Sequence, residues 1–409
     1  MKSYLYFLFI ILFFGCASPN TKNVGSKDIQ ADNSFYTIDF PEILKKQREV
    51  PISDIADSIK YIVLETSPRC LLGRILDAKF SKDYVFIKHR GGPLAQFDRT
   101  GNFIQYIGSI GRGPQEYDGI KEFSIDEEHK VIYIQFIFGR KISVFSFEGK
   151  YIKSINLDQD LGFIVWSRDS LFMCFNEPTI GDEGYVFTEI NSKGSILQSV
   201  KNFCFWQTAP KRMRFMTLYP GRNVFYLLNR TLHFKGWYND TIYTYSSNKE
   251  IIPKFFVDLG KYRLPDELRL ERTGKSAPSD YYWDCIKESS RYVFIRYATY
   301  AEALDGKGLF DDGYLYYDKK TGESGALINS NGEIGFVNDL GGGPEFIPEY
   351  TTDSLAFHFI ESADIKKYLA SDKFLKSTPK YPNQKEMLIK QLDGLSGNDN
   401  PIIMVVKLK

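Results

Sequence analysis

The sequence contains few of the residues from which metal sites and nucleophilic active sites are usually built. Its 409 residues include 4 His, 5 Cys and 4 Trp. It contains no H-E-x-x-H, C-x-x-C or G-x-S-x-G motif. The histidines are isolated from one another along the chain. We therefore expect no metal and no cofactor, and we assign no catalytic residue. The histidines are His89, His129, His233 and His358.

The chain also lacks an excess of charge of either sign. Lys and Arg number 52 against 51 Asp and Glu, so charge gives no support for nucleic-acid binding. Hydrophobic residues make up 43% and charged residues 25%, which is typical of a globular protein and excludes intrinsic disorder. Aromatic residues are abundant, with 33 Phe and 27 Tyr. Because aromatic side chains suit pleated, half-buried surfaces, this composition favours β-structure.

The N-terminal apolar run, Tyr4–Phe14, is too short to span a bilayer as a helix. It is followed by Gly15-Cys16, and the arrangement resembles the lipobox of bacterial lipoproteins. The resemblance implies a signal peptide over residues 1–15 and lipidation of Cys16, the alternatives being an uncleaved anchor or a chance cysteine. Residues 16–50 are then the lipidated cysteine and a tether. No Asp follows Cys16, which favours lipid anchoring at the outer membrane of the cell envelope.

The four other cysteines are widely spaced. Four cysteines in an oxidising compartment allow three disulfide pairings, and spacing does not choose between them. Cys174 and Cys204 lie in apolar, strand-like runs, which favours buried free thiols over disulfides. The other two are Cys70 and Cys285.

Short apolar-alternating segments separated by turns recur with a period near 50 residues. Such a period predicts a closed ring of similar sheets, because one four-stranded unit cannot bury both of its faces alone. Residues 51–409 are therefore predicted to form an all-β, six-bladed β-propeller of four-stranded antiparallel blades. The clearest predicted strands of the first three units are 84–88, 94–97, 103–107, 131–136, 142–145, 151–155, 171–175, 185–190 and 196–200; those of the later units are 224–228, 241–245, 255–259, 292–296, 314–317 and 354–358.

The two ends of this region are both strongly apolar. We predict that Ser58–Leu64 pairs with Pro401–Leu408 in the last blade, closing the ring, because an unpaired apolar C-terminal strand would promote aggregation. Helical patterns are scarce. The best candidates, Ser362–Ser371 and Gln384–Leu395, interrupt the last blade.

Several segments together resemble one family. The turn Asp98–Ile104 and the glycine-rich connection Ile107–Tyr117 are similar to those of NHL-type propellers. With the lipobox, the whole mature chain resembles the six-bladed β-propeller lipoproteins of Bacteroidetes. The resemblance implies a fold and an envelope location, and no established activity. The other matching segments are Tyr61–Thr66, Asp339–Glu345 and Asp399–Lys409.

Three loops are predicted to share one rim of the ring. They contain Arg90, Arg112 and Arg140, whose guanidinium groups bind carboxylates, phosphates and aromatic faces. Tyr117 on the same rim and Trp237 in a polar loop complete the candidate ligand-binding residues. The alternative is that the glycines serve tight turns while the arginines are solvated or pair with acidic neighbours.

These features favour a non-catalytic envelope lipoprotein, a monomer whose propeller binds a glycan, a peptide or an envelope protein partner. The alternative is a propeller hydrolase or lyase whose site lies in the central channel. Such a site would use carboxylates or histidines brought together by the fold, and their separation cannot be read from sequence spacing.

Overall fold

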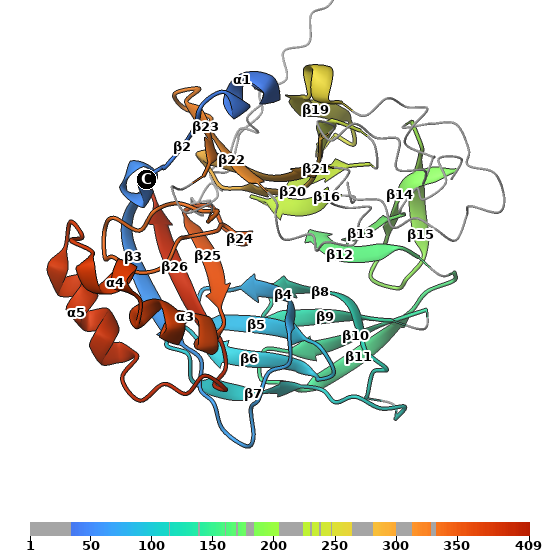
Figure 1. The fold of residues 1–409 in the computed structure, drawn as a ribbon. Helices are drawn as coiled ribbons and strands as arrows, with labels where there is room; N and C mark the ends of the chain where they lie inside the picture. The colour runs from blue at the N-terminus through green and yellow to red at the C-terminus, as the bar shows by residue number, and fades with distance from the viewer. Residues whose placement is uncertain are drawn as a thin grey trace, which may run out of the picture. The chain divides into compact units, whose positions relative to one another are not determined.

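The strands form six sheets, each with four antiparallel strands at its centre. In five of the sheets these four strands are consecutive in the sequence; the sixth combines three late strands with one early strand. The computed structural model describes residues 34–409, apart from 114, 138–139, 160, 169–170, 177–183, 204–223, 230, 237–238, 247, 264–280, 300–312 and 329–332. Within Phe35–Lys409 the sheets form a ring around a central axis, as Figure 1 shows. The predicted six-bladed β-propeller is confirmed.

Blades one to three are formed by consecutive strands, and in each the first strand lies innermost. Blade one contains β4 (Ile75–Phe80), β5 (Tyr84–His89), β6 (Leu94–Asp98) and β7 (Phe103–Ile107). Blade two contains β8 (Ile120–Asp126), β9 (Val131–Phe136), β10 (Lys141–Ser146) and β11 (Tyr151–Asn156). Blade three contains β12 (Phe163–Arg168), β13 (Leu171–Phe175), β14 (Tyr185–Ile190) and β15 (Ile196–Lys201).

Blades four to six follow the same plan. Blade four contains β16 (Val224–Leu228), β17 (Thr231–Lys235), β18 (Thr241–Tyr245) and β19 (Ile251–Asp258). Blade five contains β20 (Tyr281–Glu288), β21 (Tyr292–Thr299), β22 (Gly313–Asp318) and β23 (Ser324–Leu327). Blade six contains β24 (Tyr350–Thr351), β25 (Leu355–Ile360), β26 (Ile402–Leu408) and β3 (Ala56–Val63).

The ring is closed by the two ends of the propeller, as predicted. β26 pairs antiparallel with β3, with Met404 opposite Tyr61 and Ile402 opposite Val63. The C-terminal strand is thus the third strand of blade six, and the N-terminal strand is its outermost strand. Because the two strands are far apart in the sequence, this pairing joins the ends of the fold.

Residues assigned to the tether from sequence add one strand each to the sheets of blades four and five. β1 (Tyr36–Asp39) adds in parallel to β19, and β2 (Gln47–Arg48) adds in parallel to β23. Between them the short helix α1 (Phe40–Leu44) begins after Asp39, whose side chain accepts a hydrogen bond from Glu42 N. A single helical turn, η1 (Ile52–Asp54), precedes β3. The described fold therefore extends upstream of residue 51, because Ile38, Phe40 and Ile43 are buried against blades four and five.

The helical segment interrupts blade six between its second and third strands, as predicted. It consists of α3 (Ser362–Leu369), α4 (Asp372–Lys376) and α5 (Pro382–Gln391). Ile365, Phe374 and Leu388 pack into the apolar cluster that blades five and six share. No helix in the described part of the chain has the length and apolar character needed to cross a membrane.

The core is divided among the interfaces between neighbouring blades. Six apolar clusters occupy these interfaces, so each sheet is covered on both faces. Cys174 is a buried free thiol, as favoured from sequence, and Cys70 is also a buried free thiol. Cys204 and the side chain of Cys285 lie outside the described residues.

Candidate functional site

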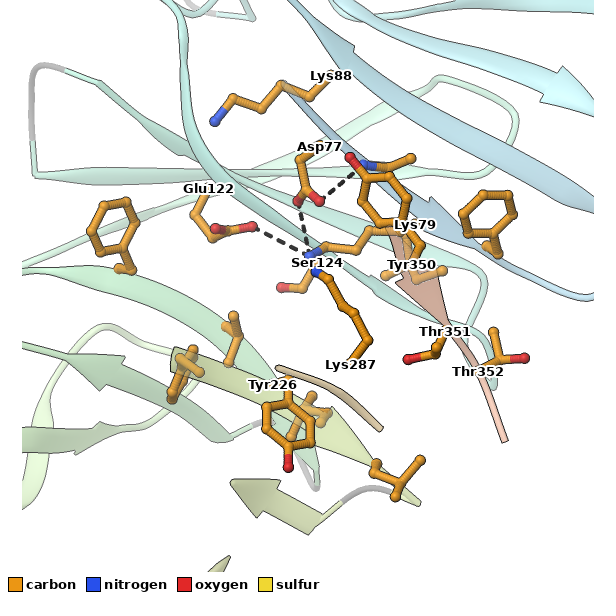
Figure 2. Close-up of a pocket in the computed structure, with 18 of the residues that line it drawn as sticks. Asp77, Lys79, Lys88, Glu122, Ser124, Tyr226, Lys287, Tyr350, Thr351 and Thr352 are labelled. Carbon is orange, nitrogen blue, oxygen red and sulfur yellow. Dashed lines mark hydrogen bonds and ion pairs between the residues drawn. The ribbon is translucent and has the colours of Figure 1, made fainter. Parts of the chain in front are cut away.

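A cavity of about 720 Å³ lies on the axis of the propeller. It is lined by residues of the six innermost strands β4, β8, β12, β16, β20 and β24, so it is the central channel of the ring. Its volume lies within the range of small-molecule binding sites. Figure 2 shows the side chains that project into it.

One side of the cavity is charged, and its centre is Lys79 on β4. Lys79 Nζ lies 2.9 Å from Asp77 Oδ2 and 3.7 Å from Glu122 Oε1, and Glu122 belongs to β8 of the next blade. Burial opposes the charge on Lys79, but the two carboxylates outweigh it and raise the pKa of Lys79. Burial raises the pKa of Glu122, while Lys79 acts in the opposite direction. This Asp77–Lys79–Glu122 network links blades one and two across the channel wall.

Three further lysines line the same cavity. Lys88 Nζ donates to Lys121 O at 2.8 Å, and Lys121 Nζ donates to Leu161 O at 2.8 Å. Lys287 Nζ lies 5.3 Å from the centre of the Tyr350 ring. Burial, together with Lys79, lowers the pKa of Lys88. These lysines thus donate hydrogen bonds to backbone carbonyls or lie over an aromatic ring in the channel wall.

A second charged group lies in the wall between blades four and five. The Glu288 side chain is completely buried and accepts a hydrogen bond from Tyr226 Oη at 2.7 Å. Its Oε1 lies 2.6 Å from Lys319 Nζ and 3.0 Å from Lys254 Nζ. Burial acts to raise the pKa of Glu288, but the two lysines outweigh it and hold the pKa below its ordinary value. We interpret this group as a structural ion cluster, because the Glu288 carboxylate is bound by protein side chains on both of its oxygens.

Apolar and aromatic side chains line the cavity beside the charged ones, and Lys121 Nζ lies 5.7 Å from the centre of the Phe163 ring. Phe163 and Val165 of β12 lie there with Phe225 and Leu227 of β16. Leu227 is 36% exposed, and Leu76 on β4 is 50% exposed, so both present apolar surface to the channel. A ligand in this cavity can therefore contact charged groups and apolar surface at the same time.

None of the four histidines lines the cavity. His233 is buried behind it, where burial and then Lys254 lower its pKa to about 3. Burial lowers the pKa of His358 to about 4. Within the described ranges, no three His, Cys, Asp or Glu side chains are grouped closely enough to hold a metal ion.

The predicted rim residues lie away from the cavity lining. Arg90, Arg112 and Arg140 are exposed at the same end of blades one and two, in connections between strands two and three or between neighbouring blades. Arg140 Nη1 donates to Asp158 O at 3.2 Å. Trp237 lies outside the described residues.

Tyr117 is not on the surface of the rim. Its side chain is completely buried, and its hydroxyl donates to Ile107 O at 2.7 Å and accepts from Leu94 N at 2.9 Å. The glycine-rich connection before it is held by its own backbone bonds, with Gly111 N donating to Tyr117 O. Tyr117 therefore anchors this connection to the core between blades one and two.

The cavity residues were missed by the sequence analysis because they lie on the innermost strands. β4 and β8 read Ile-Leu-Asp-Ala-Lys-Phe and Ile-Lys-Glu-Phe-Ser-Ile-Asp, and charged residues dilute their apolar alternation. The available signal was the repeat itself. A segment of strand length is needed before each predicted second strand if every blade has four strands.

Solved structures share this fold. A candidate exported protein of Bacteroides fragilis NCTC 9343 has a TM-score of 0.68 and 16% sequence identity, covering 92% of this chain and 100% of its own. A member of the DUF4221 family from Bacteroides vulgatus has a TM-score of 0.50 and 10% identity, covering 89% of this chain and 99% of its own. At these identities the similarity establishes the fold alone.

No curated protein matches the sequence. A family described as "Domain of unknown function (DUF4934)" matches residues 35–407, which span the strands of all six blades and the helical segment of blade six. Because this match covers most of the chain, the protein belongs to the DUF4934 family.

Proposed function

We propose that the protein is a non-catalytic binding protein whose ligand occupies the central channel. The observation that carries the proposal is the cavity of about 720 Å³, whose lining combines lysines and carboxylates with aromatic and aliphatic side chains. Pockets that combine apolar surface with a few fixed polar groups are typical of ligand sites. A saccharide or the end of a peptide has the size and the mixed polarity that such a cavity accepts.

The proposal includes an envelope location. The lipobox ending in Cys16, the resemblance to NHL-like propeller lipoproteins and the exported relative support a lipid anchor at the outer membrane. We propose that the anchored protein is a monomer. Globomycin treatment of cells that produce the protein tests the anchor, since it blocks cleavage of lipid-modified precursors. Accumulation of the precursor supports lipidation, and normal processing in a Cys16→Ala variant argues against it.

A hydrolase or lyase is the second candidate, and Glu122 is the observation that favours it. Its carboxyl group lies in the channel, and burial raises its pKa, as a general acid requires. However, both Glu122 and Asp77 are engaged by Lys79, and this arrangement stabilises charge rather than leaving a carboxyl group available for proton transfer. Turnover of a bound ligand that is abolished in Glu122→Gln would favour the enzyme.

Filling the channel tests whether it is the binding site. Leu76→Trp and Leu227→Trp add bulk at positions where apolar side chains are exposed to the cavity. Ile152→Trp on β11 is the matched control, because Ile152 is also 50% exposed but lies on the outermost strand of blade two. Glycan and peptide libraries would be screened against the full chain and these variants by thermal shift, in which ligand at a hundredfold excess over Kd adds about 2.7 kcal/mol.

A stabilisation lost in both channel variants and kept in Ile152→Trp supports the proposal. A stabilisation kept in both channel variants contradicts it. If that stabilisation is lost instead in an Arg112→Ala, Arg140→Ala variant, the ligand binds at the rim of blades one and two.

A further inference from the structure

The carboxylates that line the channel already have partners within the protein. Asp77 and Glu122 share Lys79, and Glu288 is bound by Lys254 and Lys319. The remaining carboxylate, Asp353, accepts from the amide of Asn229 at 2.8 and 3.0 Å in the amide orientation that satisfies both groups. These carboxylates are therefore committed to internal contacts.

Lys88 and Lys287 are in a different position. Lys88 donates to a backbone carbonyl, and Lys287 lies over the Tyr350 ring, so each ammonium contacts a neutral group. Glu122 and Asp77 attract Lys88 electrostatically and Glu349 attracts Lys287, but no ion pair within 4.0 Å involves Lys88 or Lys287 in the described part of the chain. Each ammonium therefore has carboxylates nearby but none in direct contact, and an oxyanion of a ligand can supply that contact.

The charge balance of the channel and the wall directly behind it is positive. Six lysines face four carboxylates there, an excess of two positive charges. Glu349 and its neighbour Arg296 are of opposite charge type and do not reverse the excess. Confined positive charge with low-dielectric walls raises the local concentration of anions. The lysines are Lys79, Lys88, Lys121, Lys254, Lys287 and Lys319, and the carboxylates are Asp77, Glu122, Glu288 and Asp353.

We propose that the channel ligand carries an oxyanion, a carboxylate, phosphate or sulfate group, that Lys88 and Lys287 attract. This inference rests on the proposed function and specifies the chemistry of its ligand. Figure 2 shows Lys88 and Lys287 on either side of the Asp77–Lys79–Glu122 network in the view drawn. The rest of the ligand lies against the apolar side chains of the lining, which include Phe163 and Leu227.

Matched pairs of ligands that differ only in the anionic group provide the test. The pairs are glucuronic acid and glucose, glucose 6-phosphate and glucose, glucose 6-sulfate and glucose, and an acetylated dipeptide as its acid and its amide. Binding to the full chain, purified in detergent, would be measured by calorimetry. We expect at least one acid to bind tenfold or more tightly than its neutral partner, with an affinity that falls as salt is added.

The variants assign the preference to the two lysines. Lys88→Met combined with Lys287→Met removes both charges and keeps most of the apolar stems, and we expect it to abolish the preference. Lys88→Arg with Lys287→Arg keeps the charges and should retain it. Lys390→Met on the exposed surface of α5 is the control and should leave binding unchanged. Circular dichroism and thermal melts would verify that each variant is folded.

The outcomes separate this inference from the proposed function. If the acid and the neutral member of each pair bind equally well, and Leu76→Trp abolishes this binding, the oxyanion proposal is wrong and channel binding still stands. An acid preference that persists in the double Met variant overturns the assignment to Lys88 and Lys287. The oxyanion proposal is also overturned if no ligand pair binds at millimolar concentration and if inorganic phosphate and sulfate fail to protect Lys88 and Lys287 from acylation. In that case the library screen alone decides whether the channel binds a ligand.

Discussion

Lys319 Nζ lies 2.6 Å from Glu288 Oε1 in an ion pair from which water is almost excluded. Lys254 contacts the same oxygen at 3.0 Å, so one carboxylate balances two buried ammonium groups. Replacing Glu288 by Gln removes the charge and retains the shape. We expect the free energy of unfolding to fall by about 3–5 kcal/mol, because buried lysines are left without a counter-charge. Urea denaturation followed by circular dichroism measures the change.

Glu386→Gln is the control for this substitution. Glu386 is exposed on α5, and surface substitutions of this kind change stability by about 0.5 kcal/mol or less. If Glu288→Gln is as stable as Glu386→Gln, the buried cluster does not support the interface between blades four and five in the way the contacts indicate.

The closure of the ring depends on β26, in which Met404 is completely buried opposite Tyr61. Met404→Ala leaves a cavity between blades five and six, and we expect a loss of about 2–5 kcal/mol in the free energy of unfolding. Lys407 lies in the same strand and is exposed, so Lys407→Ala is the matched control. Equal stability of the two variants in guanidinium unfolding would contradict a closing role for the buried face of β26.

Much of this fold could be predicted from the sequence because its signals are local. The turn after Asp98 places glycine where φ is +99°, and a Cβ at Gly101 would approach Val63 O to 2.1 Å. The pairing of β3 with β26 followed from two apolar strands that each needed a partner. Each of these features depends on a few residues, and the type of each residue is explained directly by the backbone conformation or the strand pairing at its position.

The channel could not be predicted in the same way. Asp77 and Glu122 are 45 positions apart and meet at Lys79 only because neighbouring innermost strands face one axis. The glycine-rich segment before Tyr117 was interpreted as a ligand-binding loop, whereas in the structure its aromatic residue is buried. An aromatic residue after a glycine-rich turn has the same local pattern in both roles. Only burial distinguishes them, and burial depends on the neighbouring blade.

Asp98 organises the turn between β6 and β7. Its Oδ1 accepts hydrogen bonds from Thr100 N at 2.8 Å and Asn102 N at 3.0 Å. Burial acts to raise the pKa of Asp98, but these bonds and those from the two side chains outweigh it and lower the pKa. We expect Asp98→Ala to reduce the free energy of unfolding by about 1 kcal/mol at neutral pH.

The effect of Asp98→Ala should depend on pH. Since the folded state holds the carboxyl group with a lowered pKa, its contribution is complete above the unfolded pKa of about 3.9 and is lost as pH falls through the folded value. The difference between wild type and variant should therefore shrink in acid. Asp57→Ala, at an exposed position on β3, is the control for general acid effects. A difference that grows in acid would disprove this account of the turn.

Glu349 precedes β24 and provides a pH dependence of opposite sign. Its Oε2 accepts a hydrogen bond from Phe359 N at 2.8 Å. Burial raises the pKa of Glu349 to about 7, although this bond and the charges of Lys287 and Arg296 oppose the shift. In the unfolded chain the same group ionises near pH 4.3. The folded state therefore binds the proton more tightly than the unfolded state over the interval between these values.

This difference makes the folded protein progressively less stable as pH rises from about 4.3 to about 7, because the unfolded chain releases the proton over this interval while Glu349 in the fold retains it; above about 7 the loss is complete. The loss amounts to at most about 4 kcal/mol for this group. Glu349→Gln removes the titration, so we expect the variant to gain stability relative to wild type between pH 5 and pH 8. Urea unfolding at several pH values measures that gain, with Glu386→Gln as the control. A gap between wild type and Glu349→Gln that stays constant with pH would show that Glu349 ionises normally in the fold.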